Sequence, residues 1–135
     1  MMKTYAFDAC ALIAFFNQEQ GADKVEDLLM MKNCSRLMSV INIYEVCYDA
    51  AKSSGIDEGI KLYHEIRKLP ISIVRKIGEN VLKEAIGFKV AYKLSVADSF
   101  ALGLAKVNNA MLVTADHHEF DIIEKAKALE FYWIR

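Results

Sequence analysis

Short apolar runs alternate along the chain with longer segments whose apolar residues recur at helical spacing. We predict strands at residues 3–7, 36–41, 71–74, 111–114 and 131–134, where the runs are short and bounded by polar or turn-forming residues. We predict helices at 8–16, from Gly21 onward, at 42–55, from Asp57 up to Pro70, at 78–93, at 95–108 and within 117–129. This alternation indicates an α/β fold with a mainly parallel central sheet and helices on both faces.

Length and composition narrow the class of protein. The 135 residues fit one domain, 1–135, because no repeat or Pro/Gly/Ser-rich linker divides them. A hydrophobic share of 54% is that of a globular chain, and a net charge of −1 lacks the basic balance typical of non-specific nucleic-acid binding. Cys10, Cys34 and Cys47 form no C-x-x-C pair, and the apolar run 9–16 is too short to span a membrane. We therefore expect a cytoplasmic protein without membrane contact.

An acidic residue stands at each of four junctions between a strand and a helix. These residues are Asp8, Glu45, Asp98 and Asp116. In an open α/β sheet such junctions meet in a crevice outside the carboxyl ends of the strands. Acids gathered there repel one another unless protons or cations intervene, and carboxylate oxygens suit Mg²⁺ or Mn²⁺. The pattern predicts a metal-dependent phosphodiesterase that activates water.

Helix capping is the structural alternative for each acid taken singly. Asn42 and Ser95 each precede an acid by three residues, as in a capping box, and the other two acids can cap their helices directly. Capping does not explain why none of the four sites uses Ser or Thr, which cap equally well, in place of the acid, so the joint pattern favours chemistry. A phospho-acceptor receiver domain needs an acidic pair after its first strand, where Asp8 stands alone. A haloacid-dehalogenase-type phosphatase needs Asp-x-Asp, where Cys10 fills the second position.

Four segments carry a family resemblance. They read Asp8-Ala-Cys-Ala-Leu-Ile-Ala, Asn42-Ile-Tyr-Glu45-Val, Leu94-Ser-Val-Ala-Asp98-Ser-Phe-Ala-Leu and Leu112-Val-Thr-Ala-Asp116. In order, spacing and total length they resemble the four acidic motifs of PIN domains, and VapC-type toxins in particular, over nearly the whole chain. The resemblance implies a PIN-like three-layer sandwich and an Mg²⁺- or Mn²⁺-dependent endoribonuclease. It also implies a homodimer paired with a small VapB-like antitoxin.

The resemblance further implies roles for individual residues. The expected catalytic and metal-binding acids are Asp8, Glu45, Asp98 and Asp116, with Asp8 and Asp98 as direct ligands and Thr114 holding water or metal. The family commonly has Ser or Thr where this chain has Cys10, and a thiol is a poorer hydrogen-bond donor than a hydroxyl. Two alternatives stay open: a DNA or flap-type nuclease on the same scaffold, and a catalytically silent module that binds RNA or a partner.

The helix predicted at 57–69 carries more apolar side chains than one stripe can bury. Leu62 falls on a different part of the helix surface from Ile60, Tyr63 and Ile66. Leftover apolar surface of this kind marks a partner site. We therefore expect Leu62 to lie in a contact with a second copy of the chain or with the antitoxin.

Overall fold

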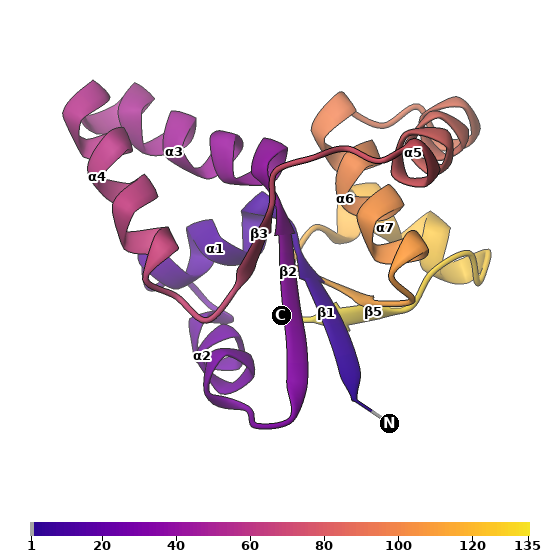
Figure 1. The fold of residues 1–135 in the computed structure, drawn as a ribbon, viewed down its shortest axis with the longest axis horizontal. Helices are drawn as coiled ribbons and strands as arrows, with labels where there is room; N and C mark the ends of the chain where they lie inside the picture. The colour runs from indigo at the N-terminus through magenta and orange to yellow at the C-terminus, as the bar shows by residue number, and fades with distance from the viewer. Residues whose placement is uncertain (1) are drawn as a thin grey trace.

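A sheet of parallel strands forms the centre of the computed structural model, which describes residues 2–135 (Figure 1). Its spatial order is β3-β2-β1-β4-β5, and each neighbouring pair is parallel. The strands are β1 (Lys3–Phe7), β2 (Cys34–Ser39), β3 (Ser72–Val74), β4 (Met111–Thr114) and β5 (Phe131–Trp133). The predicted α/β fold with a parallel sheet is confirmed.

Helices cover both faces of this sheet, as predicted. The first four lie on one face and the last three on the other, to the left and right of the strands in Figure 1. Their bounds are α1 (Ala9–Phe16), α2 (Ala22–Met30), α3 (Val40–Ser54), α4 (Ile56–Arg67), α5 (Glu79–Tyr92), α6 (Val96–Val107) and α7 (His117–Lys125). Within residues 2–135, no helix combines the length and the apolar character that crossing a membrane requires.

Alternating side chains along the strands separate two hydrophobic cores. Tyr5 and Phe7 pack with buried residues of α1 to α4, whereas Ala6 between them packs with those of α5 to α7. Val113 and Leu112 divide in the same way on β4. Successive residues of a strand point to opposite faces, so a sheet buried on both sides needs this continuous apolar sequence.

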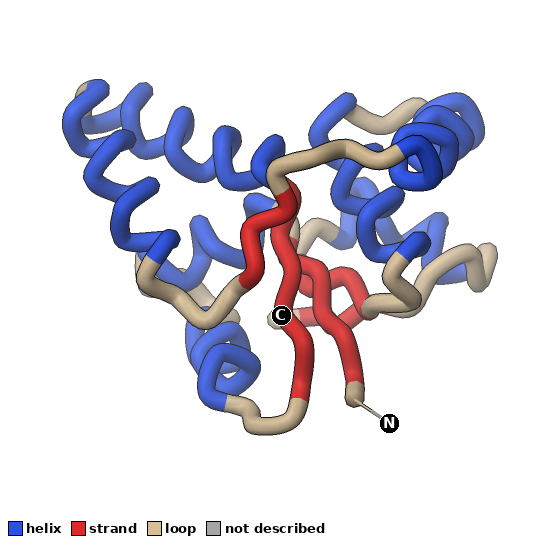
Figure 2. The backbone as a smooth tube through the Cα atoms, viewed as in Figure 1, coloured by secondary structure: helices blue, strands red, loops and turns tan. Residues whose placement is uncertain are grey.

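The strand order reverses beside β1, which places a functional crevice. The chain moves from β1 outward through β2 to β3, and β4 then pairs on the other side of β1. The register aligns Phe7 with Val113, so β1 and β4 end side by side within the sheet, whose strands are red in Figure 2. In open parallel sheets, ligands bind outside the carboxyl ends of the strands at such a switch point. Asp8 and Thr114 lie at these two strand ends.

One predicted boundary and one predicted surface residue are wrong. The second strand ends at Ser39, and α3 begins at Val40 rather than at Asn42, because the Ser39 hydroxyl accepts a hydrogen bond from the Ile41 amide and caps the helix. Leu62 is half-buried against the core below α4, while Ile60 is the residue left exposed. The contact expected at Leu62 therefore has no support in the packing.

Candidate functional site

Asp8 stands where β1 ends, at the switch point of the sheet. It caps α1, its Oδ1 accepting a hydrogen bond of 2.9 Å from the Ala11 amide. The Thr114 hydroxyl donates to the other carboxylate oxygen, Oδ2, at 2.5 Å. Asp8 is 3% exposed, and burial is the main cause that raises its pKa to about 7, which the two hydrogen bonds oppose. A buried acid of this kind takes up a proton unless a cation compensates its charge.

Thr114 connects the ends of β1 and β4. Its Oγ1 donates to Asp8 and accepts a hydrogen bond of 3.0 Å from the Asp116 amide. Asp116 in turn caps α7, its Oδ1 accepting from the Glu119 amide at 3.1 Å. The buried hydroxyl thus sets the distance between the first and the last of the four acids.

Asn42 connects the other two acids, Glu45 on α3 and Asp98 on α6. Its Nδ2 donates at 3.1 Å to Glu45 Oε1 and at 3.1 Å to the carbonyl of Ala97, the residue before Asp98. Asn42 is fully buried inside the first turn of α3, so the capping-box reading of Asn42 and Glu45 is wrong. The sequence predicted Asn42 only as a cap. Its position about one turn before Glu45, on the same face of the helix, was the signal that it could hold that carboxylate.

Capping by serine accounts for the other pair of helices. Ser39 caps α3, and the Ser95 hydroxyl accepts a hydrogen bond of 3.1 Å from the Asp98 amide and caps α6. The cap at Ser95 agrees with the capping-box spacing of Ser95 and Asp98, whereas the cap at Ser39 was not predicted. Because Ser39 caps α3, Glu45 lies beyond the first turn of this helix and has no capping role.

The electrostatics show that the structure brings all four acids together. The pKa of Asp98 is raised to about 6, mainly by burial and in addition by the charges of Glu45, Asp116 and Glu119. The charges of Asp98 and Asp116 likewise raise the pKa of Asp8. Burial also raises the pKa of Glu45, against the hydrogen bond from Asn42. Glu119 is an acid of this cluster that sequence reasoning missed, although it follows Asp116 at capping-box spacing.

Cys10 lies at the edge of this cluster, on the first turn of α1. Burial raises the pKa of its thiol to about 11, and the negative charges of Asp8 and Asp116 add to the effect. The thiol therefore stays neutral at physiological pH, which is compatible with a place beside two carboxylates.

The donor set fits a hydrated divalent cation better than a metal cage. Among residues 2–135, no group of three or more His, Cys, Asp or Glu side chains is arranged to hold an ion by itself. Mg²⁺ keeps several waters and binds through one or two carboxylates together with substrate phosphates. Buried, mutually repelling carboxylates, two of them held by Thr114 and Asn42, supply that kind of incomplete shell.

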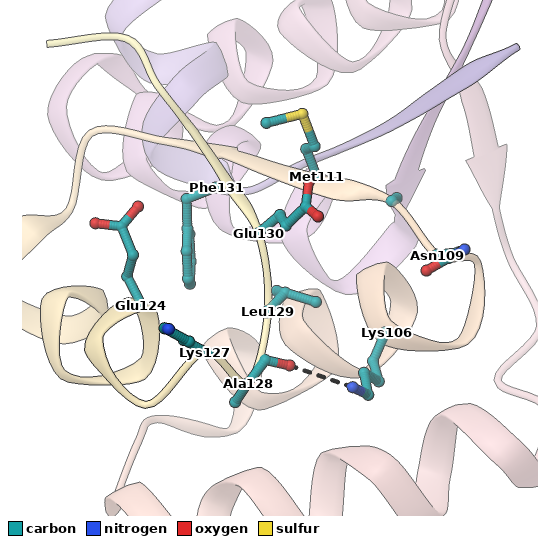
Figure 3. A pocket seen from close by; sticks show the side chains of 10 residues that line it. Lys106, Asn109, Met111, Glu124, Lys127, Ala128, Leu129, Glu130 and Phe131 are labelled. Carbon is teal, nitrogen blue, oxygen red and sulfur yellow. Dashed lines mark hydrogen bonds between the residues drawn. The ribbon is translucent and has the colours of Figure 1, made fainter.

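A cavity of about 670 Å³ lies at the end of the sheet opposite to the four acids (Figure 3). It is lined by Met111 and Phe131, the first residues of β4 and β5, and by Lys106, whose ammonium donates to the Ala128 carbonyl at 3.3 Å. None of the four acids lines it. It is therefore separate from the candidate site.

Comparison with known proteins identifies the family and agrees with the fold. Residues 5–126 match the model of the PIN domain, and the chain belongs to the PIN-domain family. No curated protein matches it significantly.

Several solved structures share the fold. VapBC-1 from nontypeable Haemophilus influenzae is 18% identical with a TM-score of 0.73, over 97% of this chain and 98% of that one. DNA-bound VapBC from Salmonella typhimurium is 15% identical with a TM-score of 0.71, over 100% of both chains. VapC20 from Mycobacterium tuberculosis, described as a sarcin-ricin loop cleaving toxin, is 11% identical with a TM-score of 0.68, over 96% and 98%. The likeness to VapC-type toxins is thus a likeness of fold.

Proposed function

We propose that residues 1–135 form a PIN-like nuclease domain that cleaves RNA phosphodiester bonds with Mg²⁺ or Mn²⁺, as the toxin of a toxin–antitoxin pair. The observation that carries the proposal is the convergence of four acids at the switch point of the sheet, where each of three has its pKa raised. Membership of the PIN-domain family supports it, as does the described activity of VapC20.

In this proposal the chain's own residues prepare the reaction. Asp8 and Asp98 would hold the cation directly, and Asp116 and Glu45 would complete its surroundings. When bound, the cation supplies Lewis-acid activation of water and neutralises charge on the phosphate. Thr114 fixes one oxygen of Asp8, and Asn42 fixes Oε1 of Glu45. Because its pKa is raised by burial, Glu45 is suited to accept the proton of the attacking water.

The experiment is a cleavage assay on total cellular RNA and on single-stranded DNA, with Mg²⁺, Mn²⁺, Ca²⁺ or EDTA. We expect cleavage of RNA with Mg²⁺ or Mn²⁺ and none with EDTA, and little with Ca²⁺, whose larger and more flexible shell misplaces the water. Cleavage of DNA alone would replace RNA as the substrate. Full activity after exhaustive chelation would remove the metal from the mechanism. Inactivity with every metal would indicate a silent module, in which the thiol of Cys10 replaces the hydroxyl that is common in the family.

We further propose a homodimer with a VapB-like antitoxin in the cytoplasm. A stripe of exposed apolar residues on α5 supports a partner surface: Leu82, Ile86 and Val90 recur every four residues. Several of the structures that share this fold are toxin–antitoxin complexes. Light scattering at tens of micromolar tests the dimer. A monomer mass, or a dimer unaffected by Ile86→Glu, would contradict this surface.

A further inference from the structure

Two exposed tyrosines accompany Glu45 on α3. Tyr44 and Tyr48 are 66% and 54% exposed, and their rings stack with centroids 6.0 Å apart at an interplanar angle of 17°. Residues four apart lie on one face of a helix, and Glu45 stands between the two tyrosines in sequence. Exposed large aromatic side chains that gather at one place mark a binding surface more often than isolated ones do.

Both rings line a cavity of about 520 Å³ beside the acidic cluster. Its apolar lining comes from three elements, with Ile13 on α1, Ile41 on α3 and Val96 at the start of α6. Glu45 and Asp49 also line it. The cavity is thus continuous with the candidate site through the shared Glu45.

The chemistry of the lining disfavours an anionic group and suits a flat ligand that donates hydrogen bonds. Among the described residues that line the cavity, none is Lys, Arg or His, so a phosphate group finds no partner charge there. Aromatic faces stack on nucleobases of any identity, and apolar walls accept the faces of a base. The two carboxylates can accept N–H groups from its edge.

We propose that this cavity binds an unpaired base of the RNA strand next to the phosphate that is cleaved. The inference rests on the proposed function, which brings a single strand past Glu45. Tyr44 and Tyr48 stack on the base regardless of its identity, whereas the exposed carboxylate of Asp49 favours bases with an amino group. Adenine, cytosine and guanine carry such a group, and uracil does not.

A protein side chain is the competing occupant, since an arginine also stacks on tyrosine and pairs with carboxylates. The base is favoured because the cavity shares Glu45 with the acidic cluster, so the nucleotide next to a phosphate bound at the acids lies within reach of it. If a base occupies the cavity, replacing the tyrosines weakens the binding of RNA. If a protein side chain occupies it, the replacement weakens an association between protein chains, and the experiment distinguishes these two results.

The experiment measures fluorescence anisotropy of labelled oligo(A), oligo(C), oligo(U) and an abasic strand, each of about ten nucleotides, within the usual span of single-strand sites. Ca²⁺ in the buffer neutralises the acids without supporting the proposed cleavage. We expect Tyr44→Ala and Tyr48→Ala each to weaken binding of oligo(A) roughly 5- to 150-fold, and Tyr48→Phe to leave it nearly unchanged. The abasic strand should bind weakly and should lose nothing further in Tyr48→Ala.

Two further variants separate specificity and stability from stacking. Asp49→Asn should lower the preference for oligo(A) and oligo(C) over oligo(U), whatever it does to the overall affinity. Ile60→Ala removes a similarly exposed apolar side chain on α4, outside the cavity, and should bind as the wild type does.

Three outcomes would overturn the inference. If the tyrosine variants bind and cleave RNA as the wild type does, the cavity is not a base site, and the proposed function stands. If the wild type neither binds nor cleaves any RNA, the proposed function fails and the inference fails with it. If Tyr48→Ala lowers the mass in light scattering but leaves the affinity for oligo(A) unchanged, the tyrosines belong to a contact between protein chains.

Discussion

Replacement of Asp8 by asparagine should make the metal-free protein more stable above neutral pH. Asp8 is buried at 3% exposure, and its pKa is about 7 in the folded state against an ordinary value of 3.8. Asparagine removes the buried charge and keeps the cap of α1, because its side-chain oxygen can accept the hydrogen bond from the Ala11 amide. Most core substitutions destabilise, so a gain in stability would be specific to this cause.

The magnitude follows from the two pKa values. Above pH 7 the ionised carboxylate lowers the free energy of unfolding by about 4 kcal/mol, at about 1.4 kcal/mol per pKa unit. The variant loses the hydrogen bond that the Thr114 hydroxyl donates to Asp8, which costs about 1 kcal/mol. We therefore expect a net gain of about 2–3 kcal/mol at pH 8.

The difference in stability between Asp8→Asn and the wild type should depend on pH, in a direction that the two pKa values of Asp8 determine. Below about pH 4 Asp8 is protonated in the folded and the unfolded chain, and it contributes no difference between them. Between about pH 4 and pH 7 only the unfolded chain releases the proton, so the stability of the wild type falls as the pH rises. The effect of Asp8→Asn should therefore change from a loss of about 1 kcal/mol at pH 4, where only the hydrogen bond from Thr114 is missing, to its full gain above pH 7.

The assay is urea unfolding in EDTA from pH 4 to pH 8, for the wild type and Asp8→Asn. Asp57→Asn, on the exposed first turn of α4, controls for the loss of one surface carboxylate. Addition of Mn²⁺ should then stabilise the wild type and not Asp8→Asn, because the cation binds only the folded site. A variant that is less stable than the wild type at pH 8, or a difference that does not change with pH, would refute the reasoning.

Three further predictions concern neighbouring features. Asn42→Ala should lower the free energy of unfolding by about 1 kcal/mol in urea, because it removes two part-buried hydrogen bonds, to Glu45 and to the Ala97 carbonyl. Gly103→Ala should lower the melting temperature, since its Cβ would lie 2.9 Å from a backbone oxygen of α5, whereas Gly87→Ala meets no atom within 4 Å and should raise it. Cys10→Ser should keep or increase the rate of RNA cleavage in a gel assay, because a hydroxyl is the better hydrogen-bond donor; a tenfold loss would show that the thiol has its own role.

The arrangement of the sheet could be predicted because the strands are short, apolar and separated by amphipathic helices. The prediction failed at one local feature, the boundary between β2 and α3. Met38, Ser39, Val40 and Ile41 form a run that suits a strand or a buried helix equally, and periodicity alone does not distinguish the two. Ser39 decides the boundary through its hydroxyl, which gives the Ile41 amide a partner. A serine inside an apolar run can cap a helix, and periodicity alone does not detect such a cap.

The candidate site was predictable in its acids but not in the side chains that hold them. Asp8 and Asp116 could be predicted because each directly follows a strand. Asn42 could not, because it contacts the carbonyl of Ala97, a residue far away in sequence. Such a contact depends on how α3 and α6 pack. The exposure of Leu62 was mispredicted for a related reason, because α4 packs against α3 as well as over the core and thereby buries part of a second stripe.

The central claim, that these acids carry a metal-dependent cleavage of RNA, is tested most directly by one measurement. It compares the initial rate of cleavage of a single-stranded RNA by the wild type and by Asp98→Asn, across a range of Mn²⁺ concentrations at pH 8. Ser95 caps α6 through the Asp98 amide, so the substitution leaves that cap in place. We predict a rate that saturates with Mn²⁺ for the wild type and a loss of at least about 100-fold for Asp98→Asn, of the order seen when a charge-stabilising group is removed. Equal rates for the two proteins, or a wild-type rate independent of Mn²⁺, would contradict the claim.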